Sequence, residues 1–210
     1  NGAGKTTLVK LIARLYDPDE GRILLDGHDL REYDLSALRG NIGVIFQDSV
    51  LYHLTPAETI AVGRIDARDD HQRIVAAAER SLADGVIAKL PLGYDEVIGK
   101  RFRTGIDLSG GEWQKIAIAR AYMRDAQVLI LDEPTAALDA RAEFEVFQRF
   151  KELSRGKTAL LISHRFSSVR MADRILLLVE GEIDSSGRHE EVLARRGRYA
   201  ELFELQAAGY

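Results

Sequence analysis

The chain begins with a glycine-rich turn that runs directly into an apolar repeat with helical spacing. Gly4, Lys5 and Thr6 supply the last three positions of the phosphate-binding pattern G-x-x-x-x-G-K-[ST]. Apolar residues then recur at i, i+3, i+4 and i+7, from Leu8 to Leu15, so a helix is predicted at once. Glycine lets backbone N–H groups curl towards phosphate oxygens, and the positive end of the helix faces the same point. The turn therefore favours folds in which a loop and a helix start bind a chain of phosphates.

Each residue type at this turn suits part of a magnesium–triphosphate complex. Lys5 adds a point charge for the β- and γ-phosphates, and the Thr6 hydroxyl can ligate Mg²⁺. A plain glycine-rich helix start with a stray lysine is the alternative interpretation, because short motifs recur by chance. The first two positions of the pattern would precede residue 1, so the domain is expected to be N-terminally truncated here. The predicted nucleotide-binding residues of the turn are Asn1, Gly2, Ala3, Gly4, Lys5, Thr6 and Thr7.

Composition narrows the function classes. The 210 residues, 46% hydrophobic and 30% charged, fit one domain or one domain with an inserted lobe. The 29 basic and 33 acidic residues give a net charge of −4, which offers no electrostatic case for a nucleic-acid partner. There is no cysteine, so disulfides and thiolate metal ligands are excluded. No run approaches the roughly 18 apolar residues of a membrane span.

Apolar runs and turns predict an α/β fold, a P-loop NTPase core with a mostly parallel sheet. Runs at 42–46, 128–131 and 158–163 are expected as strands, the last two buried. An antiparallel β portion is expected from a hairpin over 174–184. An inserted α-helical subdomain is placed at about 54–122. The residues expected in the core of the helices nearer the C-terminus are Phe144, Phe147, Phe150, Tyr199, Leu202 and Phe203.

Polar residues follow these strands at the points where they end. Asp132 and Glu133 follow one strand, His164 follows another, and Gln47 ends a third. Ligands of open α/β sheets bind beyond the carboxyl ends of the strands, so these four side chains are predicted to converge near the phosphate turn.

Charge and hydrogen-bonding capacity give each of the four residues a role. Asp132 is placed to hold Mg²⁺, directly or through water, and Gln47 to contact the metal and orient the attacking water. Glu133 is the predicted general base, and His164 the predicted hydrogen-bond donor to the γ-phosphate. Alone, the acidic pair is more often a helix cap and a histidine is more often structural. Four such residues beside a phosphate turn favour phosphoryl-transfer chemistry, which needs little beyond positioning and charge stabilisation.

A second predicted anion site lies at Leu108-Ser109-Gly110-Gly111-Glu112, where Ser and Gly precede a helix. The plainer interpretation is an N-cap with Glu112 in the first turn. A second phosphate-binding helix start is expected if two copies meet head to tail, each offering this segment to the nucleotide of the other.

Over essentially its whole length, the chain resembles the nucleotide-binding domain of an ATP-binding cassette (ABC) transporter. NGAGKTT matches the Walker A loop, Gln47 the Q-loop and LSGGE the LSGGQ signature. LILDEPT matches the Walker B segment, Ala137-Leu138-Asp139 the D-loop and His164 the switch histidine. Glu112 stands where the family usually has Gln, and the adenine-stacking aromatic residue and the strand before the phosphate loop are absent from this sequence.

The resemblance implies an ATPase that dimerises around two ATP molecules with Mg²⁺. Ser109, Gly110 and Gly111 then act on the partner's nucleotide, and Asp139 joins the nucleotide-binding set. Residues 47–48 and 52–55 resemble the stretch that meets a membrane domain. The C-terminal third resembles exporter-type half-transporters, so a membrane domain is expected upstream on the same chain. The domain itself is expected at the cytoplasmic face of the cell membrane.

Other functions remain open from the sequence. A soluble ABC ATPase, either a translation factor or a DNA-repair type, is the alternative, although neither coiled-coil heptads nor zinc-binding cysteines lie between Lys5 and Ser109. A catalytically idle module is a third hypothesis, and the presence of Glu133 and His164 argues against it. The transported substrate, and the choice between homodimer and heterodimer, are left open.

Overall fold

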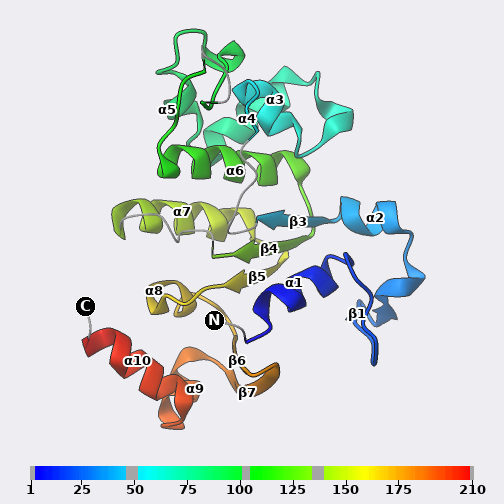
Figure 1. Cartoon of the computed structure of the whole chain (residues 1–210), viewed down its shortest axis with the longest axis vertical. Helices are drawn as coiled ribbons and strands as arrows, with labels where there is room; N and C mark the ends of the chain where they lie inside the picture. Colours follow the sequence, from blue (N-terminus) through cyan, green and yellow to red (C-terminus); the bar gives the residue numbers. More distant parts are fainter. Residues whose placement is uncertain (1–2, 46–51, 101–104, 134–139, 209–210) are drawn as a thin grey trace. The chain divides into compact units, whose positions relative to one another are not determined.

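The computed structural model describes residues 3–45, 52–100, 105–133 and 140–208, without the side chains of 140–142. Two compact units divide the chain. The first comprises Asn1–Asp34 and Leu161–Tyr210, and the second comprises Leu35–Leu160. Both units mix helices with strands (Figure 1).

The first unit joins the two ends of the chain. Its N-terminal segment holds one helix, a two-stranded hairpin and a 3₁₀ turn, and its C-terminal segment holds a longer hairpin and three helices. The elements are α1 (Lys5–Ile12), β1 (Leu24–Leu25), β2 (His28–Asp29), η1 (Leu30–Glu32), α8 (Phe166–Val169), β6 (Ile175–Val179), β7 (Glu182–Gly187), α9 (His189–Ala194) and α10 (Arg198–Ala208).

Both hairpins of this unit turn on an acidic residue followed by glycine. Asp26 and Gly27 have φ values of 51° and 84°, and Glu180 and Gly181 have 51° and 88°. Two successive positive φ values match the right-handed twist of the strands that such tight turns connect. β1 pairs antiparallel with β2, and β6 with β7, as the sequence predicts for the second hairpin.

Aromatic residues form the core of the C-terminal segment. The Phe166 ring lies 5.2 Å from both Tyr199 and Phe203, and Tyr199 is 3% exposed beside Ile175 and Val192. Leu202, expected in this core, is instead 42% exposed. On a helix, residues 199 and 203 share a face, whereas 202 lies towards the side, so only part of the apolar set is covered.

The second unit is built on a parallel pair of strands. β3 (Ile42–Ile45) pairs with β4 (Val128–Asp132), with Ile45 opposite Leu131 at their carboxyl ends. β5 (Thr158–Ile162), whose first residues belong to this unit, lies next to β4 and gives the order β3-β4-β5. β5 is an edge strand of this described sheet, and it starts with exposed residues rather than being buried throughout. The parallel sheet and the antiparallel hairpins confirm the predicted mixed α/β class.

Helices make up most of the rest of the second unit. They are α2 (Leu35–Gly40), α3 (Pro56–Ala61), η2 (Ile65–Ala67), α4 (His71–Ser81), α5 (Asp84–Ile87), η3 (Gly93–Asp95), α6 (Gly110–Arg124) and α7 (Ala140–Leu153). The run from α3 to α6 falls in the range expected for a helical subdomain, whose boundaries stay a prediction.

Helix α6 is the central element of this unit. It contacts α3, α4, α7 and β3, and seven of its residues between Ile116 and Met123 are buried (Figure 1). Alanines at Ala117, Ala119 and Ala121 allow neighbouring elements to approach closely, while the isoleucines fill the core.

Helix α7 corrects one core prediction. Phe147 and Phe150 are 5% and 4% exposed, as expected, but Phe144 is 61% exposed. The buried face is completed by Val146 and Leu153, which sit on the same side as the two buried rings. A spacing of three residues falls 60° short of a full helical turn, so Phe144, at the end of the Phe144-Phe147-Phe150 series, lies beyond the covered stripe.

Candidate active site

The phosphate turn lies at the start of α1 in the first unit. Gly4 is the N-cap residue with φ +89°, a left-handed conformation that glycine adopts without strain. No side chain caps this helix, and no acidic residue stands in its first turn. Thr6 and Thr7 are exposed, and Lys5 is half-buried. The helix start thus keeps its positive end and first-turn donors uncovered by any capping side chain, as a phosphate site requires.

The donor set at this turn fits the groups that the sequence predicts. Backbone N–H groups, an ammonium and a hydroxyl are the partners that phosphate oxygens take, and the hydroxyl can also ligate Mg²⁺. Gly4 also lies close to the β6–β7 turn, because a Cβ placed on it would stand 3.8 Å from the Gly181 Cα. Within the described residues no group of three or more His, Asp or Glu could hold a metal ion.

The acidic pair lies at the carboxyl end of β4 in the second unit. Asp132 is the last residue of the strand and is 6% exposed, while Glu133 is half-buried. Glu133 has φ +46°, which is uncommon for a residue with a side chain. Strained backbone of this kind concentrates at functional sites, because the surrounding structure must hold it. The parallel register also brings the carboxyl ends of β3 and β4 together, as the convergence hypothesis requires.

The signature segment forms a complete N-cap of α6. Ser109 Oγ accepts a hydrogen bond from the Glu112 N–H at 3.4 Å, and Glu112 Oε2 accepts one from the Ser109 N–H at 2.9 Å. The hydroxyl of Ser109 also donates to Glu112 Oε2 at 2.8 Å. The hydrogen bond from the Ser109 backbone lowers the pKa of Glu112, and the Ser109 side chain adds to this. Within one chain, this segment therefore forms a plain N-cap. Its contact with a partner's nucleotide stays a prediction.

His164 lies in the first unit, between β5 and α8. Ser163 Oγ accepts a hydrogen bond from the Arg165 N–H at 3.0 Å, which tightens the turn around His164. Gln206 of α10 contacts the backbone of the same turn. Sequence reasoning finds His164 but misses Gln206, because 42 residues separate the two and no local pattern links them.

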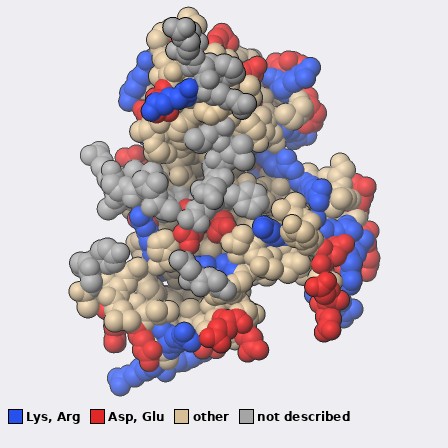
Figure 2. Space-filling view, in the orientation of Figure 1, with Lys and Arg blue, Asp and Glu red and all other residues tan. Residues whose placement is uncertain are grey.

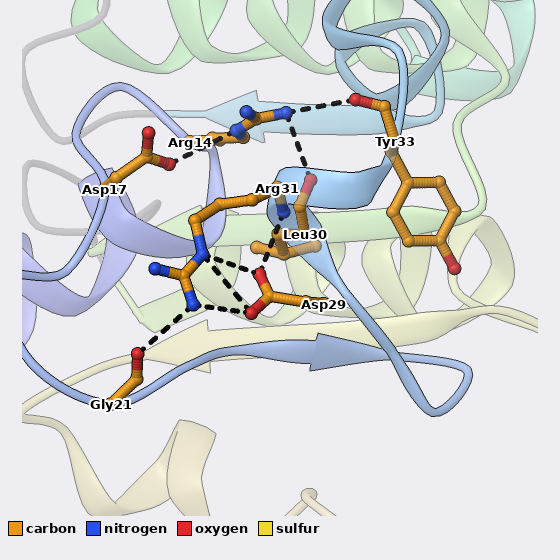
Figure 3. A network of polar contacts seen from close by, with 7 residues as sticks. All are labelled: Arg14, Asp17, Gly21, Asp29, Leu30, Arg31 and Tyr33. Carbon is orange, nitrogen blue, oxygen red and sulfur yellow. Dashed lines mark hydrogen bonds and ion pairs between the residues drawn. The ribbon is translucent and has the colours of Figure 1, made fainter.

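A guanidinium group ties the end of α1 to the segment after β2 (Figure 3). Arg14 Nη1 donates to the carbonyl oxygens of Leu30 at 3.0 Å and Tyr33 at 3.1 Å, and its Nε donates to Asp17 at 3.2 Å. Arg14 therefore fixes the C-terminal end of the helix whose other end carries Lys5. A basic residue near a helix C-terminus is the one sequence signal that indicates such a role.

A second arginine stiffens the same region (Figure 3). The side chain of Arg31 donates to both carboxylate oxygens of Asp29, and its Nη2 also reaches the Gly21 carbonyl at 3.4 Å. The hydrogen bonds from the Arg31 side chain and backbone lower the pKa of Asp29 to about 2. Asp29 is thus ionised at any physiological pH, and it also caps η1.

The stretch expected to meet a membrane domain packs against α6. The Arg120 guanidinium lies 5.1 Å from the centre of the Tyr52 ring, and burial lowers the pKa of Arg120. Thr55 begins α3 with a capping box that it forms with Glu58. A cation over an aromatic face is favourable, so Tyr52 is tied to the helix that starts at the signature segment.

Several predicted site residues fall in different parts of the chain. Lys5, Thr6 and His164 belong to the first unit, and Ser109 to Gly111 with Asp132 and Glu133 to the second. Their convergence on one nucleotide stays a prediction. The predicted site residues that lie outside the described residues are Asn1, Gly2, Gln47 and Asp139.

The surface and the helix lengths add two observations. On the face drawn in Figure 2, acidic and basic side chains are interspersed over the surface. Among the described residues, every helix is too short or too polar to traverse a bilayer.

Fold and site together define an α/β domain of the P-loop ATP-binding class. A family model described as ABC transporter matches residues 1–136. The chain is 48% identical over 206 residues to an ATP-dependent lipid A-core flippase of Syntrophus aciditrophicus (strain SB), covering 98% of this chain and 33% of that protein. It is 46% identical over 208 residues to a mitochondrial potassium channel ATP-binding subunit of Rattus norvegicus, covering 99% of this chain and 28% of that protein.

A solved structure agrees with these relatives. A bacterial Atm1-family ABC exporter with ATP bound is similar with a TM-score of 0.89 and 40% identity, over 99% of this chain and 35% of that one. The chain spans about a third of the length of the curated relatives it matches. It belongs to the ABC transporter family, as the ordered motifs predict, and corresponds to the family's ATPase domain.

Proposed function

We propose that this chain is the ATP-hydrolysing motor domain of an exporter. The observation that carries the proposal is the match of nearly the whole chain to ATP-dependent transporters, with the phosphate turn and Glu133 both in place. The alternative of a soluble ABC ATPase is not favoured, because the similar proteins are named as a flippase, a channel subunit and an exporter. Two relatives with different names are almost equally similar to this chain. We therefore propose that the membrane domain, and not this domain, selects the cargo.

The residues divide the work of binding between two groups. Lys5 and the first-turn N–H groups of α1 hold the β- and γ-phosphates, and Thr6 and Asp132 hold Mg²⁺. The metal supplies charge neutralisation on the phosphate oxygens. Residues Asn1 to Thr7 belong to the loop that binds the triphosphate.

Hydrolysis then depends on three side chains. Glu133 accepts a proton from the attacking water, and Gln47 orients that water. His164 donates a hydrogen bond to the γ-phosphate as negative charge shifts during bond breaking. The reaction needs no covalent intermediate, because positioning and charge stabilisation supply most of the rate in phosphoryl transfer.

The assembly that we propose is a dimer with two shared sites. Ser109, Gly110 and Gly111 of one chain bind the γ-phosphate held by the other, and Asp139 contributes to nucleotide binding. A transmembrane domain, on the same chain, contacts residues 52–55 and moves as the dimer closes and opens. The domain then lies at the cytoplasmic face of the membrane.

The assignment of the base is tested by Glu133→Gln in the full-length transporter. Loss of the proton acceptor is expected to lower kcat by about 10²- to 10⁴-fold, the usual share of general base catalysis. ATP binding and the ATP-dependent dimer should persist, measured by equilibrium binding and size-exclusion chromatography. The matched control is Glu182→Gln, an exposed residue at the start of β7. Fast phosphate release by Glu133→Gln would remove Glu133 from this role, and no release by the unaltered protein would defeat the proposed function.

A further inference from the structure

One side chain of the last helix contacts the backbone on both sides of Arg165. The Gln206 Oε1 accepts a hydrogen bond from the Phe166 N–H at 2.9 Å, and its Nε2 donates to the His164 carbonyl oxygen at 3.2 Å. Helix α8 starts at Phe166, and Arg165, its N-cap residue, makes no side-chain capping bond. Gln206 therefore provides from α10 the cap that α8 lacks locally, and at the same time holds the residue that carries the imidazole.

Ser163 also binds the backbone of this turn. Ser163 Oγ accepts from the Arg165 N–H at 3.0 Å, so Ser163 and Gln206 together satisfy polar groups of three consecutive residues, 164 to 166. The Cα position and the peptide planes on each side of His164 set the direction in which its side chain leaves. A shift at this point changes where the imidazole nitrogens lie, and catalytic hydrogen bonds tolerate little displacement.

Helix α10 is itself held in place next to this turn. Tyr199, Phe203 and Gln206 recur at i, i+4 and i+7, so they share one face of the helix. The Phe166 ring contacts both aromatic residues, each at 5.2 Å between ring centres. The Tyr199 hydroxyl lies 2.9 Å from His189 Nδ1. Gln206 thus projects from a helix packed on the element that it caps, which is how a supporting residue keeps a functional one in register.

We propose that Gln206 is a positioning residue for His164 during ATP hydrolysis, an inference that rests on the proposed role of His164. Both ends of the amide are used, so the chemistry selects glutamine. Glutamate keeps the acceptor for the Phe166 N–H, but it has no donor for the His164 carbonyl. Methionine has a similar length and provides neither hydrogen bond.

The first experiment separates positioning from simple helix capping. Gln206→Met and Gln206→Glu are introduced into the full-length transporter, and kcat, KM for ATP and the melting temperature are measured. Both variants are expected to lower kcat by about five- to tenfold, the size of one or two lost neutral hydrogen bonds, with KM changed less than about twofold. Gln206→Glu should melt within about 2 °C of the unaltered protein, because its cap on α8 is kept. Glu204→Gln, exposed on the same helix, is the matched control.

The second experiment asks whether Gln206 acts through His164. Phosphate release is followed in single turnovers for His164→Ala, Gln206→Met and the double variant. If Gln206 only positions His164, Gln206→Met should have no further effect once the imidazole is gone, whereas independent effects would multiply.

Several results would overturn the positioning role of Gln206. Normal kcat in Gln206→Met or Gln206→Glu, or an equal loss with and without His164, would overturn the positioning role and leave the proposed ATPase intact. Parallel changes in KM and melting temperature in both variants would reduce Gln206 to a structural cap and also overturn it. Full activity of His164→Ala would instead remove His164 from the reaction, and the inference would fall with it.

Discussion

At the scale of single residues, the signature segment forms a reciprocal cap at the start of α6. The side chains of Ser109 and Glu112 each accept a hydrogen bond from the backbone N–H of the other residue. The first N–H groups of any helix have no partner within the helix, so they need such a cap. The LSGGQ signature that this segment resembles has Gln at the position of Glu112, and both residue types can close a capping box. The substitution is therefore mild within one chain. It adds a negative charge near the helix start, where the macrodipole favours it.

We predict that Glu112→Gln makes this capping box less dependent on pH. The folded state lowers the pKa of Glu112, so its ionised form stabilises the protein at neutral pH. That contribution is lost as the pH falls below the ordinary value of 4.5 towards the lowered pKa of the folded state. Glu112→Gln should cost roughly 0.5 kcal/mol at pH 7, a small value because the site is partly exposed to solvent.

The measurement is urea unfolding of both proteins from pH 7 to pH 3. The difference in unfolding free energy between them should shrink as the pH falls through the titration of Glu112. A difference that stays constant down to pH 3 would show that the carboxylate charge contributes nothing to the cap.

At the scale of elements, the close approach of α3 and α6 depends on a missing side chain. Gly63 follows α3, and a Cβ placed there would overlap the carbonyl of Arg120 and stand 3.1 Å from the Met123 Cβ. Arg124 adds a hydrogen bond to the Gly63 carbonyl at 3.3 Å and contacts the carbonyls of Ile42 and Arg39. The C-terminal end of α6 is thus bound to three separate segments of its unit. These bonds hold α6 close to the end of α3, where only glycine leaves enough room.

We predict that Gly63→Ala destabilises the protein by about 2 kcal/mol, because the added methyl group must push backbone apart. Gly85→Ala is the matched control. Gly85 is exposed in α5 with nothing within 4 Å of its Cβ position, so alanine there should stabilise by about 0.5 kcal/mol through helix propensity. Thermal and urea unfolding of the two variants measure both effects. Equal stability of the two variants would show that α3 and α6 are not in tight contact.

At the scale of the whole molecule, the proposed sites each combine two chains. Ser109 and Gly110 are exposed and lie in a different unit from Lys5. The proposed head-to-tail pairing gives the second helix start, at Ser109 and Gly110, a role at the nucleotide of the partner chain. This pairing also predicts which mixed dimers are active, because Lys5 and Ser109 of one site then come from different chains.

We predict that two inactive chains restore one working site when they pair. Lys5→Ala should weaken ATP binding, and Ser109→Arg should leave binding to one chain intact while abolishing turnover. A heterodimer of Lys5→Ala with Ser109→Arg keeps one unaltered pair, so it should hydrolyse ATP above either parent dimer. A heterodimer of the double variant with the unaltered chain has no intact pair and should be inactive.

Doubly tagged heterodimers purified by both tags provide the measurement, with phosphate release in detergent or lipid. The opposite pattern, with activity only in the heterodimer that contains one unaltered chain, would place Lys5 and Ser109 of each site in the same chain.

The local features of the fold were predictable from the sequence because short-range sterics decide them. The glycine-rich start of α1, the Glu180-Gly181 turn and the cap at Ser109 depend on residues within four positions of each other. The strands β3 and β4 were predictable because strands covered on both faces are continuous apolar runs. The family motifs supplied the order of the site residues, and in the structure Asp132 ends β4 and Glu133 follows it.

Tertiary structure alone decided which apolar faces are covered and which distant groups meet. Periodicity shows that Phe144 and Leu202 are apolar, but their 61% and 42% exposure depends on where neighbouring elements end. The bonds of Arg14 to the segment after β2, and of Gln206 to the turn at His164, join residues 16 to 42 positions apart. Such contacts form because packing brings their elements together, and a one-dimensional pattern does not carry that distance information.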